Sequence, residues 1–560
     1  MAHEFSTGGR PWMALCVAFG LGIGATPGQA AEQAAPVLTE GQEALQASAG
    51  ADEVIAEFYA ARDHRPLWSG AQGTARRKAL IAAFEAAGDH ALPSERYQAA
   101  ALEAAHHSAS TPAQAAEAEL ALTEAYLRYA RDMSSGLLTP SEVDDELFIY
   151  PKDRPILDLL NAMSWADDPS IWLASLAPKT RDYAQLLTRY QSYRQIGADA
   201  VWGEALSKQK TLRAGDRSEQ VITLRDRLTA MGFHPAETLS AGGEVELATA
   251  ETANDATDPG LPDPQVFDDL LESAVIRFQA QHGLNQDGAV GPATRGAINT
   301  SATERARQIA VNLERIRWLN RDLGKKHIYV NIASFDMTVF DQGEPVFESR
   351  VVVGKSRKHR TPEFSDEMEY MVVNPSWNVP YSIASKEILP KLQENPNYLE
   401  ENNMTLRGVD DPSLIDWNEI TRRTFPGKIK QAPGPGNALG EVKFMFPNQH
   451  SIYLHDTPSK SLFARDRRAY SHGCIRVQRP QEFAHFLLSA QRDDAQAYYE
   501  RQIAREKETW VHLDEHVPVH LTYRTAWVDR DGEDQFRADI YGRDERVLAA
   551  LAEAGVALPQ

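Results

Sequence analysis

The chain has 560 residues, 42% of them hydrophobic, which is enough for roughly three or four domains with sizeable cores. Its 79 acidic side chains outnumber the 58 basic ones, and the net charge of −21 argues against nucleic acid and anionic membrane surfaces as partners. There are two cysteines, Cys16 and Cys474.

The first 30 residues read as a secretory signal peptide. Arg10 gives the positive start, residues 12–25 form an apolar run, and Gly28-Gln29-Ala30 is a small-x-small cleavage site. The run is short for a membrane span, although an uncleaved N-terminal anchor is the alternative. We therefore expect a periplasmic protein that begins near Ala31 and has no integral membrane span after cleavage.

Cleavage would leave Cys474 as the single thiol, unable to form an intramolecular disulfide. Residues 31–50 consist largely of alanine, glutamine and glutamate, and they are predicted to be a flexible linker.

Residues 51–205 have a helical pattern. An apolar stripe at helical spacing begins at Val54, and residues 120–133 form a second amphipathic pattern. His106 and His107 lie side by side on a polar helix without a second ligand cluster, so they are predicted to be solvated and not a metal site. The region is predicted to be helical and non-catalytic.

Residues 206–302 contain two helical halves. The first has an apolar stripe that includes Val221 and Leu224, and in the second Pro292 suits the first turn of a helix. Between them, residues 236–265 carry seven acidic residues and neither lysine nor arginine. This composition predicts a flexible inserted loop.

The pattern changes after residue 302. Residues 303–325 are predicted to form a connecting helix, and short β patterns with frequent turn residues predict a sandwich or barrel over residues 326–525. Residues 377–432 interrupt this β pattern, and a long excursion inside a β domain is usually functional. Residues 526–560 are expected to form a helical, peripheral tail.

The lone thiol lies in the sequence Ser-His-Gly-Cys-Ile-Arg-Val at residues 471–477. Gly473 allows close backbone approach, and the following residues read as a strand, so His472, Cys474 and Arg476 would share one face. A cation on each side of a thiol lowers its pKa. Cys474 is therefore predicted to be a nucleophile, in preference to a small buried hydrophobic residue.

His455 lies where a short β run gives way to turn formers, a place from which loops present catalytic side chains. A histidine there can accept the thiol proton and later protonate a leaving amine. His472 is the alternative base, but side chains two positions apart on a strand lie about 6.5–7 Å from each other. His455 is therefore the predicted proton donor and acceptor.

Residues 455–458, His-Asp-Thr-Pro, together with residues 471–477 resemble the signature of L,D-transpeptidases with the YkuD-type catalytic domain. The resemblance covers most of the chain after about residue 50. Three further segments resemble the large periplasmic YcbB-like subclass, at residues 372–380, 431–437 and 454–463.

The upstream regions also resemble domains of that subclass. Residues 58–68 resemble the start of its scaffold domain, and residues 212–218 with 274–294 resemble a three-helix peptidoglycan-binding domain. The implied architecture is multidomain α+β: an α-helical scaffold, a three-helix peptidoglycan-binding domain and a β-rich catalytic domain with an inserted lid. The implied boundaries are 1–30 signal peptide, 31–50 linker, 51–205 scaffold, 206–302 peptidoglycan-binding domain, 303–325 connecting helix, 326–525 catalytic domain with the lid at 377–432, and 526–560 tail.

The resemblance further implies a reaction on peptidoglycan stem peptides without a cofactor or a metal. The Cys474 thiolate would form an acyl-enzyme with a tetrapeptide stem and release D-alanine, with His455 transferring protons. An amine of a second stem would then take the acyl group, giving a 3→3 cross-link between diaminopimelate residues. Water as the acceptor would give carboxypeptidase activity.

The remaining site residues are predicted from their positions around this pair. Backbone N–H groups near Gly473 and Cys474 are natural oxyanion donors. Arg476 is expected either to hold a substrate carboxylate or to brace the strand. Tyr453 and Trp377 are candidate groove walls, with the aromatic core as the alternative.

Other classes fit less well. A papain-like protease places cysteine before histidine and has a different local signature. A non-enzymatic wall-binding protein would explain export and residues 210–300, but not the histidine–cysteine pair. A metal-dependent wall hydrolase lacks a ligand cluster in this sequence.

Overall fold

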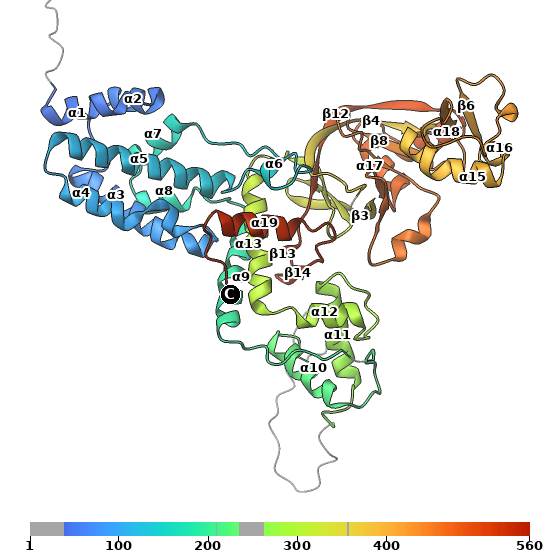
Figure 1. Cartoon of the computed structure of the whole chain (residues 1–560), viewed down its shortest axis with the longest axis horizontal. Coiled ribbons are helices and arrows are strands. Elements are labelled where there is room, and N and C mark those ends of the chain that lie inside the picture. The colour runs from blue at the N-terminus through green and yellow to red at the C-terminus, as the bar shows by residue number, and fades with distance from the viewer. Residues whose placement is uncertain (1–37, 209, 235–262, 356–357, 560) are drawn as a thin grey trace, which may run out of the picture.

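The computed structural model describes residues 38–208, 210–234, 263–355 and 358–559. The predicted signal peptide and nearly all of the acidic insertion lie outside these ranges. An elongated helical domain occupies one end of the molecule, a three-helix module lies below the centre, and a β domain continues into the lid at the other end (Figure 1). None of the helices in the described ranges is both long and apolar enough to cross a membrane.

The helical domain begins earlier than the sequence predicted. Thr39 and Gln42 form a capping box that starts a helix at Glu40, and the helix buries Leu45 and Ala49. The prediction of a flexible linker is therefore wrong for residues 40–49. The domain contains α1 (Glu40–Ala49), α2 (Glu53–Ala60), α3 (Gly70–Glu85), η1 (Ala86–His90), η2 (Ser94–Tyr97), α4 (Ala99–Ser108), α5 (Pro112–Ser135), α6 (Pro140–Val143), α7 (Ile156–Trp165), α8 (Pro169–Ala174) and α9 (Arg181–Ala198).

A buried carboxylate on α5 organises the centre of this domain. Glu119 is 2% exposed and accepts hydrogen bonds from the Tyr59 hydroxyl at 3.0 Å and the Trp68 N–H at 3.0 Å. These bonds satisfy the buried charge and tie residues 59–68 to α5.

The three-helix module consists of α10 (Glu219–Ala230), α11 (Asp269–Gln281) and α12 (Pro292–Asn299). Its own core includes Val221, Leu224, Phe278 and Ile298, all at most 1% exposed. The predicted three-helix fold and the helix start at Pro292 are confirmed.

The predicted connecting helix is α13 (Ala302–Trp318), and it packs along α9. Its neighbours also include the C-terminal segment, which holds a hairpin of β13 (Ala526–Val528) and β14 (Asp534–Phe536) followed by α19 (Arg543–Glu553). Arg543, Val547 and Leu551 are completely buried. The prediction of a peripheral tail is therefore wrong, because α19 is wedged between the helical and β domains (Figure 1).

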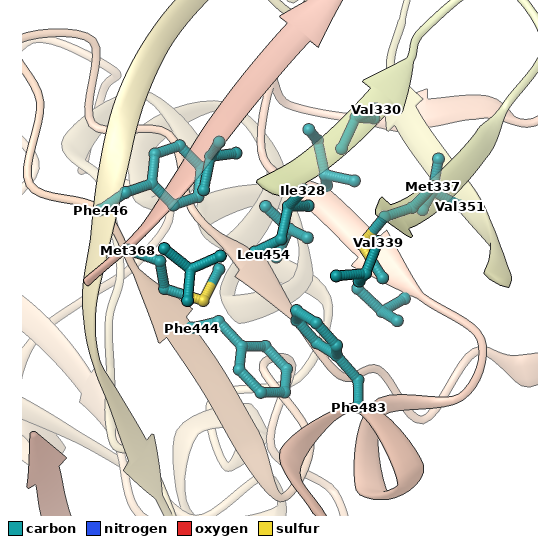
Figure 2. Close-up of a cluster of buried hydrophobic side chains, with 14 of the residues drawn as sticks. Ile328, Val330, Met337, Val339, Val351, Met368, Phe444, Phe446, Leu454 and Phe483 are labelled. Carbon is teal, nitrogen blue, oxygen red and sulfur yellow. The ribbon is translucent and has the colours of Figure 1, made fainter. Parts of the chain in front are cut away.

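The β domain is a sheet in the order β10-β3-β11-β9-β8-β4-β12-β1-β2, and pairing of β2 with β3 closes it. Its core is lined by aliphatic and aromatic side chains from successive strands, as Figure 2 shows for Ile328, Val339, Leu454 and Phe444. The strands are β1 (Lys326–Asn331), β2 (Asp336–Asp341), β3 (Glu344–Gly354), β4 (Phe364–Val373), β8 (Val442–Met445), β9 (Leu454–His455), β10 (Ala469–Ser471), β11 (Ile475–Val477) and β12 (Thr509–Thr522); α17 (Pro480–Leu488) and α18 (Ala495–Ile503) complete the domain.

Residues 377–432 fold as a small unit of their own, which we call the lid segment. A three-stranded sheet with the order β5-β7-β6 packs against short helices around a separate core that includes Leu392, Trp417 and Ile429. The elements are β5 (Trp377–Asn378), α14 (Tyr381–Ile383), η3 (Ala384–Ile388), α15 (Leu389–Glu394), α16 (Tyr398–Glu401), β6 (Met404–Arg407), η4 (Pro412–Leu414) and β7 (Lys428–Gln431).

Candidate active site

The two sequence motifs lie on neighbouring parallel strands. β9 pairs with β11 so that Leu454 is level with Ile475 and His455 is level with Arg476, and the Ile475 N–H donates to the Tyr453 carbonyl at 3.0 Å. Leu454 and Ile475 are fully buried in the barrel core. By alternation, the histidine and cysteine side chains lie on the opposite face of these strands.

The Cys474 thiol lies in a partly closed environment. Its Sγ is 3.5 Å from the Ser451 carbonyl oxygen. Burial raises the pKa of the thiol to about 11, although hydrogen bonds from Tyr453 and the charge of Arg476 act in the opposite direction. The prediction of a lowered pKa is therefore wrong for the resting site, because the loss of hydration outweighs the single nearby cation.

His455 is held in one tautomer. The side chain is buried, and its Nδ1 donates to the Asp456 carbonyl oxygen at 2.5 Å, which leaves Nε2 with its lone pair. Burial, followed by the charge of Arg476, lowers the pKa of His455 to about 3. The imidazole is therefore neutral at physiological pH and able to accept a proton.

The loop after His455 is anchored by the Asp456 carboxylate. This group accepts the Thr457 N–H at 2.6 Å and the Glu441 N–H at 3.0 Å, and it forms an ion pair with Lys460. A Cβ at Gly440 would collide with the carboxylate, so only glycine fits beside it. The backbone carbonyl that orients His455 is thus fixed in place.

His455 and Cys474 are diagonal neighbours across the strand pair. One strand spacing and two residues of rise place their Cα atoms about 8 Å apart. No hydrogen bond joins the two side chains in the part of the chain that the structure describes. The structure brings the predicted pair onto one face but does not place them in direct contact.

His472 contacts the lid segment and His359. Its Nε2 is 2.5 Å from Glu387 Oε1 in the lid segment, and its ring lies 4.5 Å from that of His359. The predicted sharing of a face with Cys474 does not produce a contact. His472 instead links the cysteine loop to η3.

Gly473 adopts φ +120°, and an added Cβ would lie 3.1 Å from Ile452 Cδ1. Its N–H donates to Ser471 Oγ at 3.2 Å, and its carbonyl accepts from Thr361 Oγ1 at 2.7 Å. The Gly473 N–H is therefore occupied, whereas the Cys474 N–H has no backbone acceptor within the described residues.

The three predicted substrate contacts have different surroundings. The guanidinium of Arg476 donates no hydrogen bond to any described residue, and its Nε is buried without a partner. The predicted bracing of the strand is therefore not present. Trp377 packs against the lid core and is level with Gln431 on β7, whereas Tyr453 contacts the thiol.

Sequence reasoning missed Glu387 and Thr361. They lie 85 positions from His472 and 112 from Gly473. Neither residue carries a local pattern that reports such a contact. Among the described residues, no group of three or more histidines, cysteines or acids is placed to hold a metal ion.

Three segments match known domain families. Residues 325–512 match the L,D-transpeptidase catalytic domain (YkuD), residues 53–189 match the scaffold domain, and residues 217–298 match the "Putative peptidoglycan binding domain". These matches confirm the predicted domain types and their order.

Two curated proteins are similar to parts of the chain. A "Putative L,D-transpeptidase" of Haemophilus influenzae is 36% identical over 247 residues, which is 43% of this chain and 49% of that protein. The chain therefore spans about half the length of this relative. The N-acetylmuramoyl-L-alanine amidase CwlM of Mycobacterium tuberculosis is 37% identical over 93 residues, covering 16% of this chain and 19% of that protein.

Two solved structures are similar at lower identity. An L,D-transpeptidase from Mycobacterium smegmatis is 16% identical, covers 35% of this chain and 58% of its own, and has a TM-score of 0.18. An L,D-transpeptidase from Stackebrandtia nassauensis is 11% identical, covers 57% and 96%, and has a TM-score of 0.21. With these TM-scores, the domain assignment rests on the sequence matches.

Proposed function

Because the chain contains an L,D-transpeptidase catalytic domain preceded by scaffold and peptidoglycan-binding domains, we propose that it is an exported enzyme that cross-links peptidoglycan stems through a Cys474 acyl-enzyme. The observation that carries the proposal is the placement of Cys474 and a neutral, tautomerically fixed His455 on one face of paired strands within the matched domain.

The first step is acylation by a tetrapeptide stem. Sγ of Cys474 attacks the carbonyl of the third stem residue while its proton passes to Nε2 of His455. A thiol pKa of about 11 and a histidine pKa of about 3 support a neutral resting pair, in which the thiolate forms only as substrate binds. Catalytic hydrogen bonds often tighten only in the substrate complex, so the missing contact between Sγ and Nε2 is compatible with this step.

The tetrahedral oxyanion needs donors that no other group occupies. The Cys474 N–H meets this condition and the Gly473 N–H does not, since the latter already bonds to Ser471. We therefore assign the oxyanion to the Cys474 N–H. Collapse breaks the C–N bond, and His455 returns its proton to the departing D-alanine amine.

The second step is attack of an acceptor amine on the thioester. His455 takes the amine proton, the C–S bond breaks to give a 3→3 cross-link, and His455 returns the proton to the departing Cys474 thiolate. The unpartnered guanidinium of Arg476 supports a role in holding a stem carboxylate, because a buried cation without a partner is costly unless a ligand supplies one.

Mass spectrometry of the protein incubated with a disaccharide-tetrapeptide tests the proposal. We expect an adduct on Cys474 equal to the donor minus D-alanine, together with a cross-linked dimer in solution. Cys474→Ala is the control and should give neither. Failure of the wild-type protein to form the adduct, or an adduct that persists in Cys474→Ala, would refute the proposal.

A further inference from the structure

The lid segment contains a cavity of about 440 Å³ whose walls are cationic. Arg407, Lys428 and Lys430 line it, and Val379, Ala384 and Ile429 supply apolar surface. None of the described side chains that line the cavity is acidic.

The three cations come from neighbouring strands of the lid sheet. Arg407 on β6 is directly opposite Lys428 on β7, and Lys430 lies two residues farther along β7 on the same face. Like charges directly opposite each other destabilise a sheet. No ion pair or side-chain hydrogen bond satisfies any of the three within the described part of the chain. An anionic ligand would remove this repulsion.

The cavity is adjacent to the catalytic strands. Ala384 lines it, and Glu387, three residues along the same short helix, contacts His472 of the cysteine loop. On the other side, Lys443 is level with His455 across the β8–β9 pair. Burial lowers the pKa of Lys443, the charge of Glu508 opposes this shift and the charge of Lys430 adds to it, so the two lysines are close enough to interact. The charge of Lys443 in turn helps to lower the pKa of His455. Lysine side chains therefore connect the cavity to the proposed base, with the Glu508 carboxylate beside Lys443.

We propose that this cavity binds carboxylates of the acceptor stem peptide and guides its amine towards His455. The inference rests on the proposed function. The acceptor amine must reach the base that removes its proton, and the charged path from the cavity ends at that base. The proposed anchor of the donor, Arg476, is separate because it does not line the cavity.

The experiment separates the two substrates. A disaccharide-tetrapeptide serves as the donor, and a disaccharide-tripeptide, which has no fourth residue to lose, serves as the acceptor. The test variant is Arg407→Gln/Lys428→Gln/Lys430→Gln. The matched control, Arg423→Gln/Arg501→Gln/Lys507→Gln, removes three exposed cations that do not line the cavity.

We expect the acceptor concentration for half-maximal cross-linking to rise about tenfold in the test variant, because three charge contacts of modest strength are lost. The control variant should behave like the wild type. Amidation of the acceptor's carboxylates should weaken acceptor use by the wild type but have little further effect on the test variant.

Two outcomes would overturn the inference. If the test variant lost acyl-enzyme formation as strongly as it lost use of the acceptor, the cavity would be assigned to the donor. If the dependence of cross-linking on acceptor concentration did not change, the cations would not bind the stem. Both outcomes differ from failure of the proposed function itself, in which the wild-type protein would form no acyl-enzyme.

Discussion

Two arginines in this molecule, Arg543 and the partly buried Arg476, have opposite surroundings. Arg543, at the junction of the helical and β domains, is fully buried and donates to Glu363 at 3.0 Å, Glu146 at 3.2 Å and the Thr361 carbonyl at 3.1 Å. Arg476, on the catalytic strand, donates to no described residue. The junction pairs its charges internally, whereas the candidate active site leaves the Arg476 guanidinium and the Nε2 atom of His455 without a partner among the described residues.

Whether a charged group has partners within the protein distinguishes groups that hold the domains together from groups that are free to bind a substrate. Thr361 connects the two regions, because its carbonyl accepts from Arg543 and its hydroxyl donates to the Gly473 carbonyl. The junction thereby supports the loop that presents Cys474. Removing a junction group should mainly cost stability, and removing an active-site group should mainly cost activity.

The largest effect is expected for His455→Ala. Loss of the proton acceptor should reduce acylation by the disaccharide-tetrapeptide by about 10²–10⁴-fold, the usual contribution of general acid–base catalysis. Single-turnover formation of the acyl-enzyme, followed by mass spectrometry, measures this. Retention of the wild-type rate would show that another group accepts the thiol proton.

We also expect the alkylation rate of Cys474 to rise steeply with pH. The thiolate is the reactive form, and burial raises the thiol pKa to about 11. The rate with iodoacetamide should therefore increase about tenfold per pH unit from pH 7 towards that value. His455 is not among the groups that shift the thiol pKa, so His455→Ala should keep the same profile. A plateau below pH 9 in the wild type would contradict this.

Arg543→Met should lower the free energy of unfolding by about 3–5 kcal/mol, because it leaves buried carboxylates without their cation. Chemical denaturation followed by circular dichroism measures the change. Arg546→Gln is the matched control, since Arg546 is substantially exposed and its ion pair with Asp144 should contribute at most about 1 kcal/mol. If both variants lost the same free energy of unfolding, the buried ion pairs of Arg543 would contribute no more to stability than the exposed pair of Arg546.

Much of the β domain was predictable because its determinants are local. Alternation correctly placed Arg476 on the face opposite the buried Ile475 and Val477, although the strand begins at Ile475, after Cys474; the β run before His455 correctly placed that residue at the end of a strand. The start of α1 was also encoded locally. The Thr39–Gln42 capping box is visible in the sequence, but the composition of the surrounding residues, rich in alanine, glutamine and glutamate, favours a linker and hides it.

The remaining features depend on contacts that no local pattern encodes. The raised thiol pKa follows from burial by segments far apart in the sequence. The orientation of His472 depends on Glu387 in the lid segment, and the burial of α19 depends on Glu363 and Glu146. Local periodicity predicts which face a side chain occupies, but not what covers that face.

Arg476→Met tests whether the unpaired arginine of the candidate active site serves the substrate and not the fold. Removal of an unpaired, partly buried charge should leave the free energy of unfolding unchanged or raise it by about 1 kcal/mol. The donor KM should rise about ten- to hundredfold, because a charge-assisted contact to a stem carboxylate is lost. Steady-state kinetics and denaturation of the same preparation measure both quantities. A large loss of stability with an unchanged KM would reassign Arg476 to the structural group.

The smallest effect is expected at the contact between the lid and the cysteine loop. Glu387 and His472 are both partly exposed, so Glu387→Gln should lower the free energy of unfolding by less than about 1 kcal/mol. If the lid segment positions substrate over Cys474, the variant should lose cross-linking several-fold while alkylation of Cys474 by iodoacetamide, which needs no positioning, stays at the wild-type rate. Parallel loss of both reactions would mean that the contact only maintains the fold of the cysteine loop, and Glu387 would then belong with the junction residues.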